Sequence, residues 1–151
     1  MSISLLRTDS SHPDFIALVR QLDADLAIRD GDEHAFYAQF NKIDKIKHAL
    51  VAYNESHEPI GCGAIKAFSS DAMEVKRMWV VPAFRGKGIA SEILKALEDW
   101  ARELGYRRCV LETGKKQVEA MHLYPKNGYQ LIPNYGQYIG IENSVCFEKR
   151  L

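Results

Sequence analysis

Apolar residues recur along the chain with two distinct periods, and these periods predict its elements. Helices repeat their apolar positions every three or four residues, whereas strands alternate or form short continuous runs. Helical spacing extends over residues 15–26 and again over residues 89–104. The two stripes consist of Phe15, Leu18, Val19, Leu22 and Leu26, and of Ile89, Ile93, Leu94, Leu97, Trp100 and Leu104. Each stripe predicts an amphipathic helix that buries one face.

The first helix has an expected start and end. Ser11 precedes Asp14 by three positions, which is typical of a helix N-terminus with Ser11 as the cap. The polar run at residues 30–33 should end this helix, and a short second helix is expected over residues 33–40.

Another helix is predicted over residues 117–126, and Pro125 lies inside it. Proline removes a helical hydrogen bond and clashes with the preceding turn. We therefore expect this helix to kink or end at Tyr124, which would displace the Tyr124 hydroxyl.

Short apolar runs bounded by turn residues predict the strands. These runs cover residues 3–8, 49–53, 60–68, 72–81, 109–113, 129–132 and 144–148. The strand that follows the long central helix should lie parallel to the strand before it. The order predicts one α+β domain over residues 1–151, with a mixed, mostly antiparallel central sheet flanked by helices and one parallel βαβ crossover.

The segment at residues 80–91 joins a predicted strand to the long helix through a turn that contains Gly86 and Gly88. Glycine removes the side chain where the chain must turn and leaves backbone N–H groups accessible. A helix N-terminus with unpaired N–H groups binds anions, above all phosphate. Arg85 and Lys87 add positive charge beside it. We interpret the segment as a pyrophosphate-binding turn.

Two common phosphate-binding patterns do not fit this turn. The Walker pattern requires glycines five apart followed by Lys and Ser or Thr, and the dinucleotide fingerprint requires a third glycine. The hexapeptide Arg85-Gly86-Lys87-Gly88-Ile89-Ala90 instead resembles the Arg/Gln-x-x-Gly-x-Gly/Ala signature of the GNAT N-acetyltransferase superfamily. In that family the turn holds the pyrophosphate of coenzyme A. Taken alone, the hexapeptide is equally compatible with an ordinary strand–helix turn.

A second motif follows in the order and at the spacing that this superfamily shows. Its residues are Leu111-Glu112-Thr113, Gln117, Ala120, Leu123-Tyr124 and Gly128-Tyr129, with Gln117 where Asn is commoner. The resemblance covers residues 49–151 and implies the GNAT fold, with acetyl-CoA as cosubstrate. The cofactor-binding residues that it implies are Met78, Val80, Arg85, Gly86, Lys87, Gly88, Ile89, Ala90, Ser91, Gln117 and Tyr124.

The resemblance also implies catalytic roles. Tyr124 matches the tyrosine that protonates the leaving thiolate, although a core aromatic is the structural alternative. Acetylation of an amine requires a base, because the amine must lose its proton before it attacks. Glu112 and Glu74 are both candidates, and Glu112 is slightly favoured. Pairing with Lys76 or Arg77 is the structural alternative for Glu74.

The implied activity is transfer of an acetyl group from acetyl-CoA to a primary amine, by direct attack in a ternary complex. A small-molecule or amino-acid-like acceptor is expected, with a protein N-terminus as the second choice. Because Pro125 follows Tyr124 directly, a non-catalytic acyl-CoA sensor stays open as an alternative.

Composition narrows the remaining choices. Lys and Arg total 20, as do Asp and Glu, so no charge excess favours nucleic acid or an anionic membrane as partner. No long apolar run predicts a membrane span, and the N-terminus does not resemble a signal peptide. Three cysteines without paired spacing indicate a reducing cytoplasm, and the five histidines show no metal-ligand spacing. The sequence leaves a homodimer open.

Overall fold

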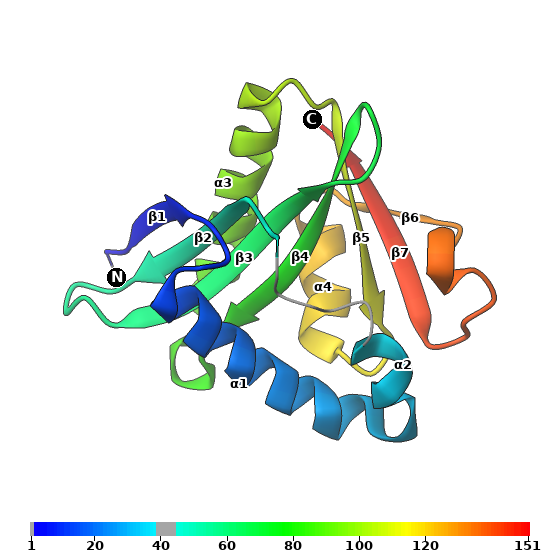
Figure 1. Ribbon diagram of the computed structural model, residues 1–151, viewed down its shortest axis with the longest axis horizontal. Helices are drawn as coiled ribbons and strands as arrows, with labels where there is room; N and C mark the ends of the chain where they lie inside the picture. Colours follow the sequence, from blue (N-terminus) through cyan, green and yellow to red (C-terminus); the bar gives the residue numbers. More distant parts are fainter. Residues whose placement is uncertain (1, 39–44) are drawn as a thin grey trace.

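The computed structural model describes residues 2–38 and 45–151, and it contains one seven-stranded sheet in the order β1-β2-β3-β4-β5-β7-β6 (Figure 1). The strands are β1 (Ser4–Thr8), β2 (His48–Tyr53), β3 (Pro59–Ala67), β4 (Ala72–Val80), β5 (Arg108–Gly114), β6 (Gln130–Ile132) and β7 (Ser144–Arg150). The helices are α1 (Pro13–Asp30), α2 (His34–Ala38), α3 (Ile89–Glu103) and α4 (Val118–Lys126). Only β4 and β5 pair in parallel among these strands, which confirms the predicted fold class.

Helices cover both faces of the sheet (Figure 1). Along β2 the side chains alternate, as a strand with two buried faces requires. Ala49 and Val51 pack with the apolar stripe of α1, whereas Leu50 and Ala52 pack with the stripe of α3. The two helical stripes predicted from the sequence are therefore the two inner faces of a three-layer structure. Within the described residues, no helix is both long and apolar enough to cross a membrane.

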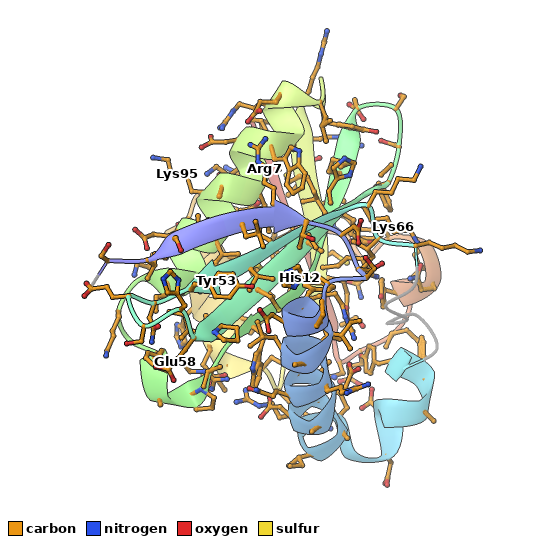
Figure 2. The ribbon with its side chains drawn as sticks, turned by 60° about the vertical axis from the view of Figure 1, so that its left-hand side comes forward. Arg7, His12, Tyr53, Glu58, Lys66 and Lys95 are labelled. Carbon is orange, nitrogen blue, oxygen red and sulfur yellow. The ribbon has the colours of Figure 1, made fainter. Side chains whose placement is uncertain are left out.

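The start of α1 differs from the prediction. His12, and not Ser11, is the N-terminal cap, because its Nδ1 accepts a hydrogen bond of 3.1 Å from the backbone N–H of Asp14. Pro13 occupies the first helical position, where its missing N–H costs nothing. The Tyr53 hydroxyl on β2 also donates to the Asp14 carboxylate at 2.6 Å, which ties the helix start to the sheet (Figure 2).

The second helix begins one residue later than expected, at His34. A 3-10 turn, Gly31–Glu33, follows α1 and leads into α2. The rest of the predicted span, residues 39–40, lies outside the described residues.

The expectation that α4 ends at Tyr124 is wrong, because the helix continues through Pro125 to Lys126. Pro125 stands in the last turn, so its missing N–H deprives a single carbonyl, that of Met121, of a helical partner. Backbone N–H groups beyond the proline close the helix end, including that of Tyr129, which donates to the Tyr124 carbonyl at 3.0 Å. The Tyr124 side chain thus stays buried.

A bulge interrupts β4 opposite Gly63. Cys62 pairs with Trp79 and Ala64 with Lys76, so two residues of β4 face one residue of β3. Arg77, inside the bulge, has a φ of +61°, a conformation that costs a non-glycine residue about 1–3 kcal/mol. The guanidinium of Arg77 reaches Asp23 of α1 at 2.9 Å and thereby helps to hold the bulge.

A buried ion pair joins Glu98 of α3 to Lys149 of β7. Glu98 is 3% exposed, and its carboxylate accepts hydrogen bonds from Lys149 Nζ at 2.9 Å and from the Tyr129 hydroxyl at 3.0 Å. The buried carboxylate requires these partners, because their interactions offset the free-energy cost of removing its charge from water.

We expect Lys149→Met to lower the free energy of unfolding by about 2–3 kcal/mol, because it leaves the Glu98 charge buried without its cation. Adding Glu98→Gln to this variant should recover more than half of the loss, because glutamine is neutral and still accepts from Tyr129. Denaturant unfolding of both variants measures this. A double variant no more stable than Lys149→Met would contradict it.

Candidate active site

The site lies where the parallel strands β4 and β5 separate. Their pairing is limited to three register positions, which end at Glu74 and Val110. Beyond these residues the two strands diverge (Figure 1). A cavity of about 470 Å³ lies there, with walls from α1, β4, the turn after β4, α3, β5 and α4. The cavity therefore reaches both faces of the sheet.

The glycine-containing turn forms one end of this cavity. Gly86 and Gly88 have φ values of +78° and +80°, and a methyl group on either would meet no atom within 4 Å. The glycines are thus required by backbone conformation, and the space beside them is open. Gly88 is the N-terminal cap of α3, so the N–H groups of the first helical turn border that space. This geometry fits an anionic group such as a pyrophosphate.

Ten of the eleven residues predicted to bind the cofactor line the cavity. The exception is Lys87, whose Nζ lies 5.7 Å from the centre of the Phe84 ring. Arg85 lines the cavity, but its side chain folds back over Trp79, with 4.7 Å from the guanidinium carbon to the ring centre. Its Nε also donates to the Val80 carbonyl at 2.9 Å. Arg85 therefore helps to fix the conformation of the turn and also adds a positive charge to it.

Asn127 is a residue of this region that sequence reasoning missed. Its side-chain amide donates to the Ser91 hydroxyl at 3.1 Å and to the Leu123 carbonyl at 2.8 Å. Asn127 thus links the end of α4 to the first turn of α3. The bond to Ser91 joins residues 36 positions apart, so no local pattern predicts it.

Tyr124 and Gln117 both line the cavity from α4 and its N-terminal cap. Tyr124 is 6% exposed and packs edge-on against Tyr129. Burial, and to a smaller extent the Glu112 carboxylate, raise the pKa of Tyr124 above its ordinary value. The phenol therefore stays protonated at neutral pH and can act as a hydrogen-bond donor or an acid.

Glu112 on β5 is a buried carboxylate in the same cavity. Burial is the main reason that its pKa is raised to about 7, and repulsion by Glu74 and Asp30 adds to this. Among the described residues, its Oε2 is buried without a hydrogen-bond partner. A carboxylate with a pKa near 7 is a much better base at neutral pH than an ordinary glutamate.

Glu74 on β4 also lines the cavity, but other side chains engage it. The Tyr135 hydroxyl donates to its Oε2 at 2.6 Å, and Lys76 Nζ lies 3.7 Å from its Oε1. The structure thus brings both predicted bases into one cavity and gives them different surroundings. Within residues 2–38 and 45–151, no group of three or more His, Cys, Asp or Glu side chains is arranged to hold a metal ion. All three cysteines are buried and free of disulfides.

Comparisons with known proteins agree with this architecture. A Klebsiella pneumoniae protein, described as an acyl-CoA N-acyltransferase by its name, superposes with a TM-score of 0.83 at 29% identity, and the match covers 99% of this chain and 97% of the other. A GNAT acetyltransferase of Elizabethkingia anophelis with acetyl-CoA bound has a TM-score of 0.69 at 18% identity, over 99% and 98% of the two chains, which supports the fold alone.

The curated relatives belong to the same class. The IAA acetyltransferase of Azospirillum brasilense is 29% identical over 151 residues, 99% of each chain. The uncharacterized N-acetyltransferase YjgM of Escherichia coli is 36% identical over 88 residues, and this match spans 56% of the present chain and 53% of YjgM.

The family model for the acetyltransferase (GNAT) family matches residues 16–129. The chain belongs to this family, and its class of enzyme is the N-acetyltransferases.

An ion-pair network crosses the outside of the cavity from α1 to α4. Glu119 in the first turn of α4 accepts from Arg29 of α1 at 3.0 Å, and Arg85 of the glycine turn lies 3.7 Å from the same carboxylate. Hydrogen bonding to Arg29 lowers the pKa of Glu119 to about 2, so this carboxylate is charged at neutral pH. Glu119 thus places a negative charge beside the turn that fits an anion and engages a cation of that turn.

We therefore expect Glu119→Gln to tighten binding of coenzyme A, by roughly two- to fivefold as measured by calorimetry, the range of surface charge effects. Glu103→Gln is a matched control, because Glu103 also pairs with an arginine, Arg7 of the edge strand β1. The side chains of Glu103 and Glu119 are similarly exposed, 57% and 58%. Equal affinity for both variants would show that Glu119 does not compete with the ligand.

Proposed function

We propose that this protein transfers the acetyl group of acetyl-CoA to the primary amine of a small or amino-acid-like molecule, in one step within a ternary complex. The observation that carries the proposal is the single cavity that joins the glycine turn to Tyr124 and Glu112. A ternary complex needs such continuity, because amine and thioester must meet without a covalent enzyme intermediate.

The residues of the glycine turn fit the cofactor that the family uses. The open space beside Gly86 and Gly88 would take the pyrophosphate, and the first N–H groups of α3 would donate to it. Gln117 would contact the pantetheine arm from the cap of α4. When bound there, acetyl-CoA supplies the activated thioester.

Glu112 and Tyr124 divide the proton transfers between them. An amine reaches the cavity mostly as an ammonium ion, and the Glu112 carboxylate takes its proton, which leaves the nitrogen lone pair free to attack. The Tyr124 hydroxyl donates a proton to the sulfur as the carbon–sulfur bond breaks, and the proton that the new amide nitrogen then loses restores the Tyr124 hydroxyl. The two pKa directions suit these roles, since Glu112 is ionised above about pH 7 and Tyr124 keeps its proton.

The surroundings of Glu112 support an amine as the acceptor. Glu74 and Asp30 act electrostatically on Glu112, and all three line the cavity together with Tyr37 and Tyr138. Carboxylates attract an ammonium ion, and tyrosine rings accept a cation over their faces.

Release of free thiol from acetyl-CoA, measured against a panel of amines, amino acids and short peptides, tests this function. We expect turnover with one or more small amines. Thiol release with peptides alone would contradict the proposed acceptor, and coenzyme A binding without turnover of any amine would leave a non-catalytic sensor as the function.

Tyr124→Phe should lower kcat by roughly 10²-fold, because it removes the acid, while affinity for coenzyme A should change little. Calorimetry and steady-state kinetics separate the two effects. Tyr53→Phe is the control, since Tyr53 donates to Asp14 at the start of α1 and does not line the cavity. Full turnover by Tyr124→Phe, with chemistry rate-limiting, would exclude this role.

A further inference from the structure

Three buried polar side chains outside the predicted site lie next to Glu112. Tyr37 on α2 is 6% exposed, Ser144 at the start of β7 is 4% exposed, and Asn143 just before it is 9% exposed. The Tyr37 hydroxyl lies 2.9 Å from the Ser144 hydroxyl, and the Asn143 side-chain amide donates to the Tyr37 oxygen at 3.3 Å. These groups come from segments more than 100 residues apart.

The register of the sheet places Ser144 beside Glu112. Glu112 on β5 pairs with Cys146 on β7, and Ser144 precedes Cys146 by two residues. Side chains two apart on a strand share a face, so Ser144 and Glu112 are diagonal neighbours on one face. Ser144 thus lies beside the Glu112 carboxylate and lowers the pKa of Glu112, against the effect of burial.

The donor is fixed at one end of this chain of hydrogen bonds. The Asn143 amide nitrogen has no lone pair to offer, so it donates and the Tyr37 oxygen accepts. Either hydroxyl can donate in the contact between Tyr37 and Ser144. When Tyr37 donates, the Ser144 oxygen accepts, and the Ser144 hydrogen is free to point at the Glu112 carboxylate, which when ionised only accepts.

We propose that Tyr37, Asn143 and Ser144 are positioning residues, which form a directed hydrogen-bond chain that orients the Glu112 carboxylate and favours its ionised form. The proposal rests on the proposed role of Glu112 as the base. It assigns to the N-terminal helical segment, through Tyr37, a part in completing the catalytic site.

The charge around Glu112 shows why such a chain is needed. Glu74 from β4 and Asp30 from α1 oppose the charge of Glu112, and Lys76 from β4 supports it. Each bond from a neutral donor to a carboxylate favours the ionised form, and the chain polarises each bond further. Among the described residues, Glu112 also acts electrostatically on Tyr37 of α2, Tyr124 of α4, Tyr138 in the 3-10 turn Gly136–Tyr138, and Cys146 of β7.

The surrounding backbone holds the chain in place. The Asn134 side-chain amide donates to the carbonyls of Tyr138, Ile141 and Ser144, at 3.0–3.2 Å, and so fixes the loop that leads into β7. At the end of β5, a methyl group on Gly114 would come within 3.1 Å of the Asn143 amide nitrogen. Gly114 thus permits the close approach that brings Asn143 to Tyr37.

The direct test follows the Glu112 carboxyl carbon by ¹³C NMR over a pH titration of the full chain, with Glu112→Gln to assign the signal. We expect Ser144→Ala to raise the pKa of Glu112 by about one unit, since it removes a hydrogen bond to a charged group. Tyr37→Phe should raise it by a smaller amount, because it acts through Ser144. An unchanged Glu112 titration in both variants would overturn the proposal.

The kinetic test uses the pH dependence of kcat/KM with an amine that turns over. The acid limb should move to higher pH in Tyr37→Phe and Ser144→Ala. Tyr135→Phe is the matched control, because Tyr135 makes the corresponding hydrogen bond to Glu74. A shift in Tyr135→Phe alone would make Glu74 the titrating base and overturn the proposal.

The two tests separate the failure of each idea. The NMR titration needs no turnover, so it decides the hydrogen-bond chain even if no amine is acetylated. If amines are acetylated while neither Tyr37→Phe nor Ser144→Ala moves the Glu112 titration, the function stands and the chain does not. Thermal unfolding of each variant confirms that it folds.

Discussion

The candidate active site depends on the early end of pairing between two parallel strands. After Glu74 and Val110 the strands β4 and β5 no longer share a ladder, so their backbone polar groups and side chains face a gap. A gap in a sheet interior is costly unless its polar groups find partners. Three features lie around this gap: a bulge on β4, a helix N-terminus beside the end of β4, and hydroxyl and amide side chains beside β5. The site is thus built from the groups that a continuous sheet would have paired.

The gap also explains why carboxylates with unlike surroundings occupy one cavity. Glu74 lies on the side where Tyr135 and Lys76 engage it, whereas Glu112 faces inward with one oxygen unpaired among the described residues. Burial disfavours the ionised form of a carboxyl group, whereas hydrogen-bond donors favour it. Two side chains of the same type therefore differ in how readily they ionise because of their positions alone. This difference supports the choice of Glu112 over Glu74, which residue type could not provide.

Local pattern predicted most of the fold, since the stripes of α1 and α3 and the strand runs reflect burial that repeats within a few residues. The glycine turn was predictable for the same reason, because Gly86 and Gly88 answer a backbone requirement at their own positions. His12 as the cap of α1 and the continuation of α4 through Pro125 were not predicted from the sequence. At both places a second local signal of similar strength, Ser11 or the proline itself, favoured another boundary. The Tyr37–Ser144 contact spans 107 residues, and no local pattern encodes it.

The bulge opposite Gly63 has a consequence for how this chain can vary. A methyl group at position 63 would come 2.6 Å from the Met78 sulfur and 2.9 Å from Leu97 of α3. The helix that carries the glycine turn therefore rests on bare backbone, closer to the sheet than any side chain would permit. Sequence drift therefore has little room at this position of β3. Even alanine at position 63 would press on α3, the helix whose N-terminus borders the cavity.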